Sequence, residues 1–157
     1  MANKLNGNLS GIKNTMLERI RSIYEIKMGL DEFASVELIA TLSECSSEIN
    51  REISVYISRD GSIVDVSIGD NAKVSMPNMR LVRNEDRLCG VRCIHTHPSG
   101  DGRLSGVDIG TLRSSKLDAM AALGVLDGKP TQMYCAYLGD VDDENGGREA
   151  LIYGPLR

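Results

Sequence analysis

The sequence predicts an α/β domain in which a mixed β-sheet is flanked by helices. Apolar residues recur at helical spacing in the first third of the chain, and they alternate with polar residues in the segments that follow. With 157 residues, 41% of them hydrophobic and 25% charged, the chain has the size and composition of one globular domain. It contains no internal repeat and no low-complexity tract, so we expect a single domain.

Two helices are expected before the first strand. Residues 1–11 are polar, with Gly and Asn, and predict an N-terminal arm. Apolar side chains at helical spacing then predict helices over residues 12–26 and 35–50. Ser35 is the expected N-cap of the second helix, because a serine hydroxyl can accept a hydrogen bond from the first helical turn.

Strands are expected to follow the second helix. Alternating apolar and polar residues predict strands over 53–57 and 63–68. Asp60-Gly61 lies between them and is typical of a tight hairpin turn. We expect a short strand over 74–76 and a polar, arginine-bearing loop over 77–88.

A buried strand is expected over residues 90–97, followed by a loop over 98–104 and a helix from Ser105 or Gly106 to about Lys116. The next segment, 118–126, is ambiguous, since its alanines favour a helix. We predict a strand there, because the turn residues after it and a second apolar run complete a hairpin. The remaining expected elements are the second hairpin strand over 131–138, an acidic loop over 140–147, and a last strand or linker over 150–153.

The two histidines of the chain lie one residue apart at the end of the expected strand 90–97. Side chains at i and i+2 of a strand point to the same face, so His95 and His97 can aim at one point. Ser105 and Asp108 stand three residues apart at an expected helix start and share a helix face. Two imidazoles and a carboxylate, with one position left open, are typical of a catalytic zinc site.

Each half of this pattern also has an ordinary structural explanation. Ser105 and Asp108 form the Ser-x-x-Asp pattern of a capping box, and a lone His-x-His pair is more often surface or core than a ligand. The two uses of Ser105 and Asp108 do not exclude each other. The chain has no His-Glu-x-x-His motif, no Cys-x-x-Cys motif and no third histidine, so a His-Glu-x-x-His protease, a zinc deaminase and a Ser/Cys-His triad lack their residues.

The stretch His95-Thr96-His97-Pro98-Ser99-Gly100-Asp101, continued to Asp108, resembles the JAB/MPN (JAMM) metalloprotease family, and more closely its bacterial RadC-type branch. The resemblance implies a JAMM-like mixed sheet flanked by helices. It also implies that His95, His97 and Asp108 bind one zinc ion, with water as the fourth ligand. Ser105 would then stabilise an oxyanion.

The same resemblance implies a glutamate that acts as general base at the head of the first long strand. Glu52, which opens the run up to Ile57, is the matching residue. Glu48, about one helical turn earlier, is the second candidate for the base, and Glu85 in the expected loop is the third.

Longer segments resemble clostridial-type HflX proteins, which are ribosome-associated GTPases that carry an extra N-terminal domain in this branch. The similar segments are residues 6–14, 47–55, 92–108, 117–120 and 122–125, and residues 152–157 resemble the junction to the rest of such a protein. The resemblance implies that residues 1–153 are this extra JAMM/RadC-like domain and that 154–157 begin the linker to a GTPase region. The expected partners are that downstream GTPase domain and, through it, the ribosome.

Two functions follow from these resemblances. We favour an accessory domain of an HflX-type GTP-binding protein that retains a JAMM-like metal site. The alternative is an active zinc-dependent hydrolase, of isopeptidase or protease type, with an unknown amide substrate. We expect no nucleotide on this chain, because the loop from Gly124 to Lys129 has glycines one residue too close for a phosphate-binding loop and is followed by Pro130.

Composition limits the partners and the compartment. The net charge of −4 argues against non-specific nucleic-acid binding, which needs a broad basic surface. We expect no membrane span and no signal peptide, and therefore a cytoplasmic protein with reduced thiols. Cys89 and Cys93 share the strand parity of the histidines and raise a Cys/His zinc site as an alternative, but Cys93 is expected to be a small buried thiol.

Overall fold

One β-sheet runs through the part of the chain that the structure describes. The structure is a computed structural model that describes residues 3–69, 90–137 and 148–153, the last range for its backbone alone. The strands are β1 (Leu5–Gly7), β2 (Ile53–Ser58), β3 (Ile63–Ile68), β4 (Val91–His97), β5 (Ala119–Leu126), β6 (Lys129–Tyr137) and β7 (Arg148–Tyr153). The helices are α1 (Asn14–Arg21), the 3-10 turn η1 (Ser22–Glu25), α2 (Val36–Ile49) and α3 (Gly106–Ser115).

The order of the strands in the sheet is β1-β3-β2-β4-β5-β6-β7. The pairs β1–β3 and β4–β5 are parallel, and the other neighbours are antiparallel. The sheet is therefore mixed and flanked by helices, as predicted. Helix α3 connects the parallel strands β4 and β5, so a parallel pair and its crossover helix lie at the centre of the molecule.

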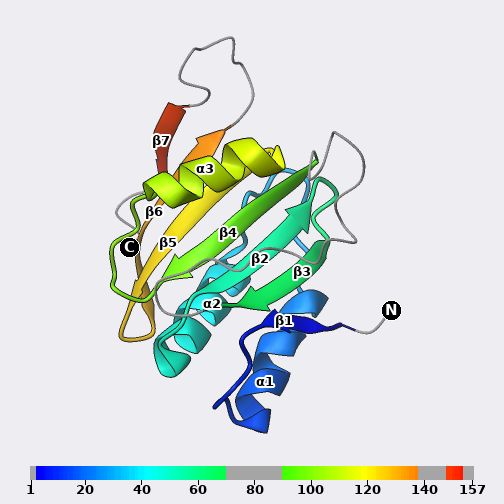
Figure 1. Cartoon of the computed structure of the whole chain (residues 1–157). Helices are drawn as coiled ribbons and strands as arrows, with labels where there is room; N and C mark the ends of the chain where they lie inside the picture. Colours follow the sequence, from blue (N-terminus) through cyan, green and yellow to red (C-terminus); the bar gives the residue numbers. More distant parts are fainter. Residues whose placement is uncertain (1–2, 70–89, 138–147, 154–157) are drawn as a thin grey trace.

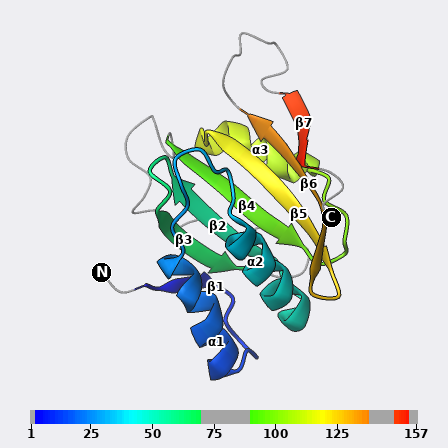
Figure 2. The same ribbon diagram turned by 180° about the vertical axis from the view of Figure 1, so that it is seen from behind.

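Helices cover both faces of the sheet. Figures 1 and 2 show α1 and α2 on one face and α3 on the other. The main core lies under α1 and α2, where residues such as Ile20, Leu42, Val55 and Ile94 are fully buried. A smaller core that contains Leu112 of α3 lies on the opposite face; its other buried members are Tyr56, Cys93, Leu117, Met120 and Ala136.

The predicted helices are confirmed with small shifts at their ends. The expected helix over 12–26 is α1 extended by η1, and the expected helix over 35–50 is α2. Ser35 is its N-cap, and its hydroxyl accepts a hydrogen bond from the Leu38 amide at 3.1 Å. Asn50 closes the helix in a left-handed conformation with φ of 55°.

The ambiguous segment 118–126 is a strand, as predicted. It pairs with β4 on one side and with β6 on the other. All its residues from Ala119 to Val125 are buried, because the sheet is covered on both faces here. Tertiary pairing thus overrides the helix propensity of its alanines.

The polar arm predicted over residues 1–11 contains a strand. Residues Leu5–Gly7 form β1, and Leu5 pairs with Val66 of β3. Leu5 is 3% exposed, so this single apolar side chain anchors the segment on the sheet. A strand of three residues is too short to show a period in the sequence, which is why the prediction missed it.

Some predictions fall outside the described residues. They are the short strand over 74–76, the loops over 77–88 and 140–147, the linker over 154–157, and the side chains of Glu85 and Cys89. Among the helices that the structure describes, none is long and apolar enough to cross a membrane.

Candidate metal centre

Two histidines occupy one face of the last residues of β4. His95 and His97 are separated by one strand residue, so both rings project from the face of the sheet that α3 covers. The His95 side chain is fully buried, and the His97 side chain is 16% exposed. Their Nε2 atoms lie 3.0 Å apart, so both rings aim at one point, as the sequence predicted.

Asp108 reaches the same point from the first turn of α3. Its Oδ1 lies 3.0 Å from Nε2 of His95, and its Oδ2 lies 3.6 Å from Nε2 of His97. Burial works to raise the pKa of this carboxyl, but its hydrogen bonds to the two imidazoles outweigh burial and hold the pKa well below its usual range. Asp108 is therefore an anion at neutral pH, as a metal ligand must be.

The spacing of these three groups fits a metal ion. Ligand atoms bound at ~2.0–2.1 Å in a tetrahedral zinc site lie about 3.3–3.4 Å apart. The shortest separations are 3.0 Å between the two imidazoles, 3.0 Å from His95 to Oδ1 of Asp108, and 3.6 Å from His97 to the other oxygen, Oδ2. Each separation is close to the tetrahedral value, with one Asp108 oxygen directed at each histidine, so these side chains can take part in a site for a metal ion.

The two histidines differ in protonation. Burial lowers the pKa of His95, which favours the neutral ring that binds a metal. Nδ1 of His97 lies 2.7 Å from the carbonyl oxygen of Asp101, and a carbonyl can only accept, so Nδ1 donates. Burial works to lower the pKa of His97, but the Asp108 carboxylate and the Asp101 carbonyl outweigh burial and raise it. A metal ion bound at Nε2 would therefore replace a proton there, while Nδ1 keeps the hydrogen bond that is usual for metal-binding histidines.

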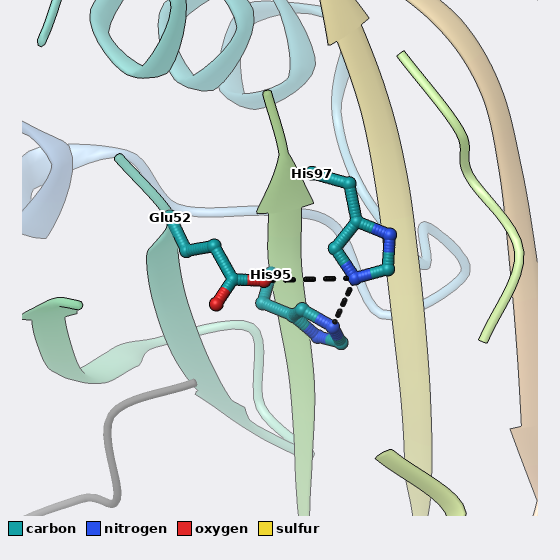
Figure 3. Close-up of side chains that lie close together, drawn as sticks. All are labelled: Glu52, His95 and His97. Atoms are coloured by element: carbon teal, nitrogen blue, oxygen red, sulfur yellow. Dashed lines mark hydrogen bonds and ion pairs between the residues drawn. The ribbon is translucent and has the colours of Figure 1, made fainter. Parts of the chain in front are cut away.

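Glu52 lies directly before β2, and its side chain points toward the imidazoles of His95 and His97. Figure 3 shows its carboxylate beside the two imidazoles, with Oε1 3.6 Å from Nε2 of His97. The residue is 4% exposed, and its Oε2 has no hydrogen-bond partner among the described residues. Burial raises the pKa of Glu52 to about 7, which His97 partly opposes. A carboxyl with this pKa is suited to accept a proton and release it near neutral pH.

The carboxylates of Asp108 and Glu52 are thus both candidates for the third metal ligand. The ligand atoms of Glu52, His95 and His97 all lie within 4.8 Å of one another, so this trio is itself a possible metal site. Asp108 approaches both imidazoles, one at 3.0 Å, whereas the nearest approach of Glu52 to an imidazole is 3.6 Å. The geometry favours Asp108 as the ligand and leaves Glu52 beside the open position.

Ser105 lies at the N-cap of α3 and makes the predicted capping box. Its hydroxyl accepts from the Asp108 amide at 3.1 Å, and its own amide donates to Oδ2 of Asp108 at 2.8 Å. The cap and the metal site therefore share one carboxylate, since Oδ1 of Asp108 faces His95. The oxyanion role of Ser105 stays a prediction.

The other candidates lie elsewhere. Cys93 is fully buried in the smaller core, where it hydrogen-bonds with Tyr56, and burial raises the pKa of its thiol above its usual range. This agrees with the prediction of a buried thiol. Glu48, the second candidate for the base, lines a cavity with Lys13 and Arg51 at the end of α2, on the face opposite α3.

Two contributors to the site were missed in the sequence. The Asp101 carbonyl orients His97, but a backbone acceptor has no sequence signal. Ser54 pairs with His95 across β2 and β4, is fully buried, and its hydroxyl has no partner within the described part of the chain. Its position two residues after Glu52 on one strand was a usable signal.

The geometry can be set against known proteins. Comparison with protein-family models, with curated proteins and with solved structures finds no match to this chain. The function must therefore be argued from the residues of the site.

The protein without a bound metal should respond to pH through Glu52. The folded protein holds a proton on Glu52 up to about pH 7, whereas an ordinary glutamate loses it near 4.5. The folded state therefore binds more protons between these values, and stability falls as pH rises through that window.

We expect Glu52→Gln to raise the free energy of unfolding by about 1–3 kcal/mol at pH 8. The gain should vanish at pH 4. Urea unfolding at both values measures it, with the exposed Glu25→Gln as control; an equal difference at both pH values would contradict the assignment.

Gly124 controls the loop that orients His97. A Cβ there would lie 2.3 Å from Oγ1 of Thr131 and 2.5 Å from the Gly100 oxygen, so the loop would have to move. We expect Gly124→Ala to weaken metal affinity by ~10-fold or more, because the Asp101 carbonyl would leave His97. Gly106→Ala is the matched control, since its Cβ would meet nothing within 4 Å. Zinc titration calorimetry compares them, and equal affinities would show that the loop does not orient the ligand.

Proposed function

We propose that this domain is a zinc-dependent hydrolase of the JAMM type that cleaves amide or isopeptide bonds. His95, His97 and Asp108 would hold the ion, and Glu52 would be the general base. The single observation that carries the proposal is the convergence of two imidazole Nε2 atoms and the buried Asp108 carboxylate, at contacts of 3.0–3.6 Å, with a second buried carboxylate beside them. A site with three protein ligands and one open position is typical of catalytic zinc.

Each residue has a defined task in the proposed reaction. A bound zinc ion would lower the pKa of its water to ~7 and polarise the substrate carbonyl. Glu52 would take one proton from the attacking water and deliver it to the leaving nitrogen, so that the C–N bond breaks as the new C–O bond is completed. The hydrogen bond from His97 to the Asp101 carbonyl would keep this ligand in place throughout.

Glu52 is well placed for this task for a structural reason. Strand β2 is antiparallel to β4, so the residue before the start of β2 lies beside the residues that end β4. Its buried, unpartnered Oε2 is an acceptor without a donor, and a buried group of this kind is costly unless a ligand or water satisfies it. The proton of an attacking water is a suitable partner.

The HflX resemblance adds a second part to the proposal: the domain would act beside a GTPase region. The segment from Gly124 to Lys129 supports a division of labour. It forms the end of β5 and a tight turn, with Leu126 paired to Lys129. A phosphate-binding loop instead joins a strand to a helix. GTP binding would then belong to the other region, and cytoplasmic location and contact with the ribosome stay predictions.

Metal reconstitution followed by a substrate panel tests the proposed function. The purified chain is stripped with a chelator, titrated with zinc, and assayed on peptide-linked and isopeptide-linked fluorogenic substrates. Hydrolysis that appears with zinc and disappears with chelator supports the proposal. Zinc binding without hydrolysis of any substrate would leave the accessory role as the better account of the site.

A further inference from the structure

A buried chain of hydrogen bonds lies on the α2 face of the sheet, directly behind the histidines. The Ile53 amide donates to Oγ1 of Thr96 at 2.9 Å, and Thr96 Oγ1 lies 2.6 Å from Oγ of Ser46. The Ser46 hydroxyl donates to the Arg51 carbonyl at 2.7 Å. Thr96 and Ser46 are both fully buried.

The donors of this chain run in one direction. Because Ser46 uses its only proton on the Arg51 carbonyl, the bond between the hydroxyls must be donated by Thr96. The chain therefore runs from the Ile53 amide through two hydroxyls to the Arg51 carbonyl. It closes around Glu52, since it begins on the residue after Glu52 and ends on the residue before it.

The position of the chain in the sheet explains why side chains are needed. Ser54 and His95 are the last residues that β2 and β4 pair through their backbones. The next pair in this register would be Ile53 and Thr96, and the Thr96 side chain supplies the bond there. Beyond His95, strand β4 continues only along β5, where His97 faces Gly124. The hydroxyl thus bridges the two strands where they part, which is where Glu52 and His97 face each other.

We propose that Thr96 and Ser46 are positioning residues that fix the backbone on both sides of Glu52 and so set the distance from its carboxylate to the two histidines. This Thr96–Ser46 clamp rests on the proposed function of Glu52 as the base. Thr96 lies between the two histidines in sequence but projects to the opposite face. Its hydroxyl therefore acts on the base without contacting a metal ligand.

The clamp makes a specific kinetic prediction. Thr96→Val keeps the shape of the side chain but leaves the Ile53 amide without its acceptor, and Ser46→Ala releases the Arg51 carbonyl. A displacement of about 1 Å at a reacting group can cost ~100-fold in rate. We expect kcat to fall about 10–100-fold in either variant, with KM and the Kd for zinc changed by less than about threefold.

A second measurement follows the clamp without any activity. Amide hydrogen exchange of the zinc-free protein should speed up at Ile53 by about 10-fold or more in Thr96→Val, with Val55 on the same strand as internal reference. Thr96→Ser retains the hydroxyl and should restore both kcat and protection of the Ile53 amide. General destabilisation would move Ile53 and Val55 together, which is not the expected result.

Ser43→Ala is the matched control. Ser43 is also fully buried on α2, and its hydroxyl donates to a backbone carbonyl, that of Ile39, at 2.7 Å. It bonds within its own helix, so its loss should leave kcat unchanged. Equal losses of kcat in Ser43→Ala and Ser46→Ala would overturn the clamp, and so would a loss explained by a weaker Kd for zinc.

The outcomes separate this proposal from the proposed function. Absence of zinc-dependent hydrolysis in the unmodified chain would defeat the hydrolase, while Ile53 exchange would still judge the clamp. Unchanged exchange at Ile53 in Thr96→Val would overturn the clamp whatever the activity. Hydrolysis in the unmodified chain with normal kcat in both clamp variants would overturn the clamp and leave the hydrolase intact.

Discussion

Replacement of Asp108 by asparagine is expected to weaken zinc binding by more than ~100-fold, and His97→Ala should do the same. Loss of an outer-shell partner alone typically costs 10–100-fold in affinity, and these residues would be direct ligands. Asp108→Asn also removes the charge that offsets the ion while it preserves the size of the side chain. We expect about one zinc per unmodified chain by elemental analysis, with affinities from competition against a chromophoric chelator.

Asp127→Asn is the matched control for that experiment. This substitution makes the same carboxylate-to-amide change at the β5–β6 turn. Asp127 has a positive φ of 52° there, which asparagine tolerates. Its zinc affinity should equal that of the unmodified chain. If the unmodified chain takes up no transition metal after reconstitution, the metal centre is refuted. If Asp108→Asn binds normally but Glu52→Gln does not, the ligand and the base have been exchanged.

Glu52→Gln is expected to retain zinc and lose hydrolysis by ~10²–10⁴-fold. Glutamine has the shape of glutamate but cannot take a proton, and general base catalysis typically contributes a factor of this size. The loss should fall on kcat, since His95, His97 and Asp108 would still hold the ion and the ion would still polarise the substrate carbonyl. The measurement is steady-state kinetics on whichever amide substrate the panel identifies, at equal zinc occupancy.

Glu48→Gln provides the comparison. Glu48 was the second candidate for the base, and it lies in the last turn of α2, where it lines a cavity with Lys13 and Arg51. Its replacement should leave kcat unchanged. If Glu48→Gln were inactive and Glu52→Gln were active, the assignment of Glu52 as the general base would be wrong.

The convergence of His95, His97 and Asp108 could be predicted from the sequence because their spacing carries the geometry. Alternation along a strand places His95 and His97 on one face, and the Ser-x-x-Asp pattern starts a helix at Ser105. Both inferences depend only on local periods, which the chain cannot violate without breaking β4 or α3. The capping box is present and leaves room for the predicted metal role of Asp108, because its two oxygens face different groups.

What could not be predicted from the residues depends on contacts between distant segments. The Asp101 carbonyl and the closed hydrogen-bond chain behind β4 involve backbone atoms, which are the same in every residue. The burial of Glu52 follows from the pairing of β2 with β4, a relationship between residues about forty apart that no local pattern encodes. Strand β1 was missed for a similar reason, since one leucine defines it.

The antiparallel register of β2 and β4 has a consequence for folding fidelity. If β2 slipped along β4 by one residue, every side chain on β2 would change face. A slip in one of the two directions would place Arg51 where Glu52 lies beside the histidines. A cation there would repel a metal ion, so a misregistered sheet could be compact and still unable to bind one. The turn at Gly61 constrains the other edge of β2, where it joins β2 to β3. Its φ of 89° and the Met28 oxygen, 2.2 Å from where a Cβ would stand, leave room for glycine alone. Metal uptake would thus report correct strand alignment in a freshly folded chain.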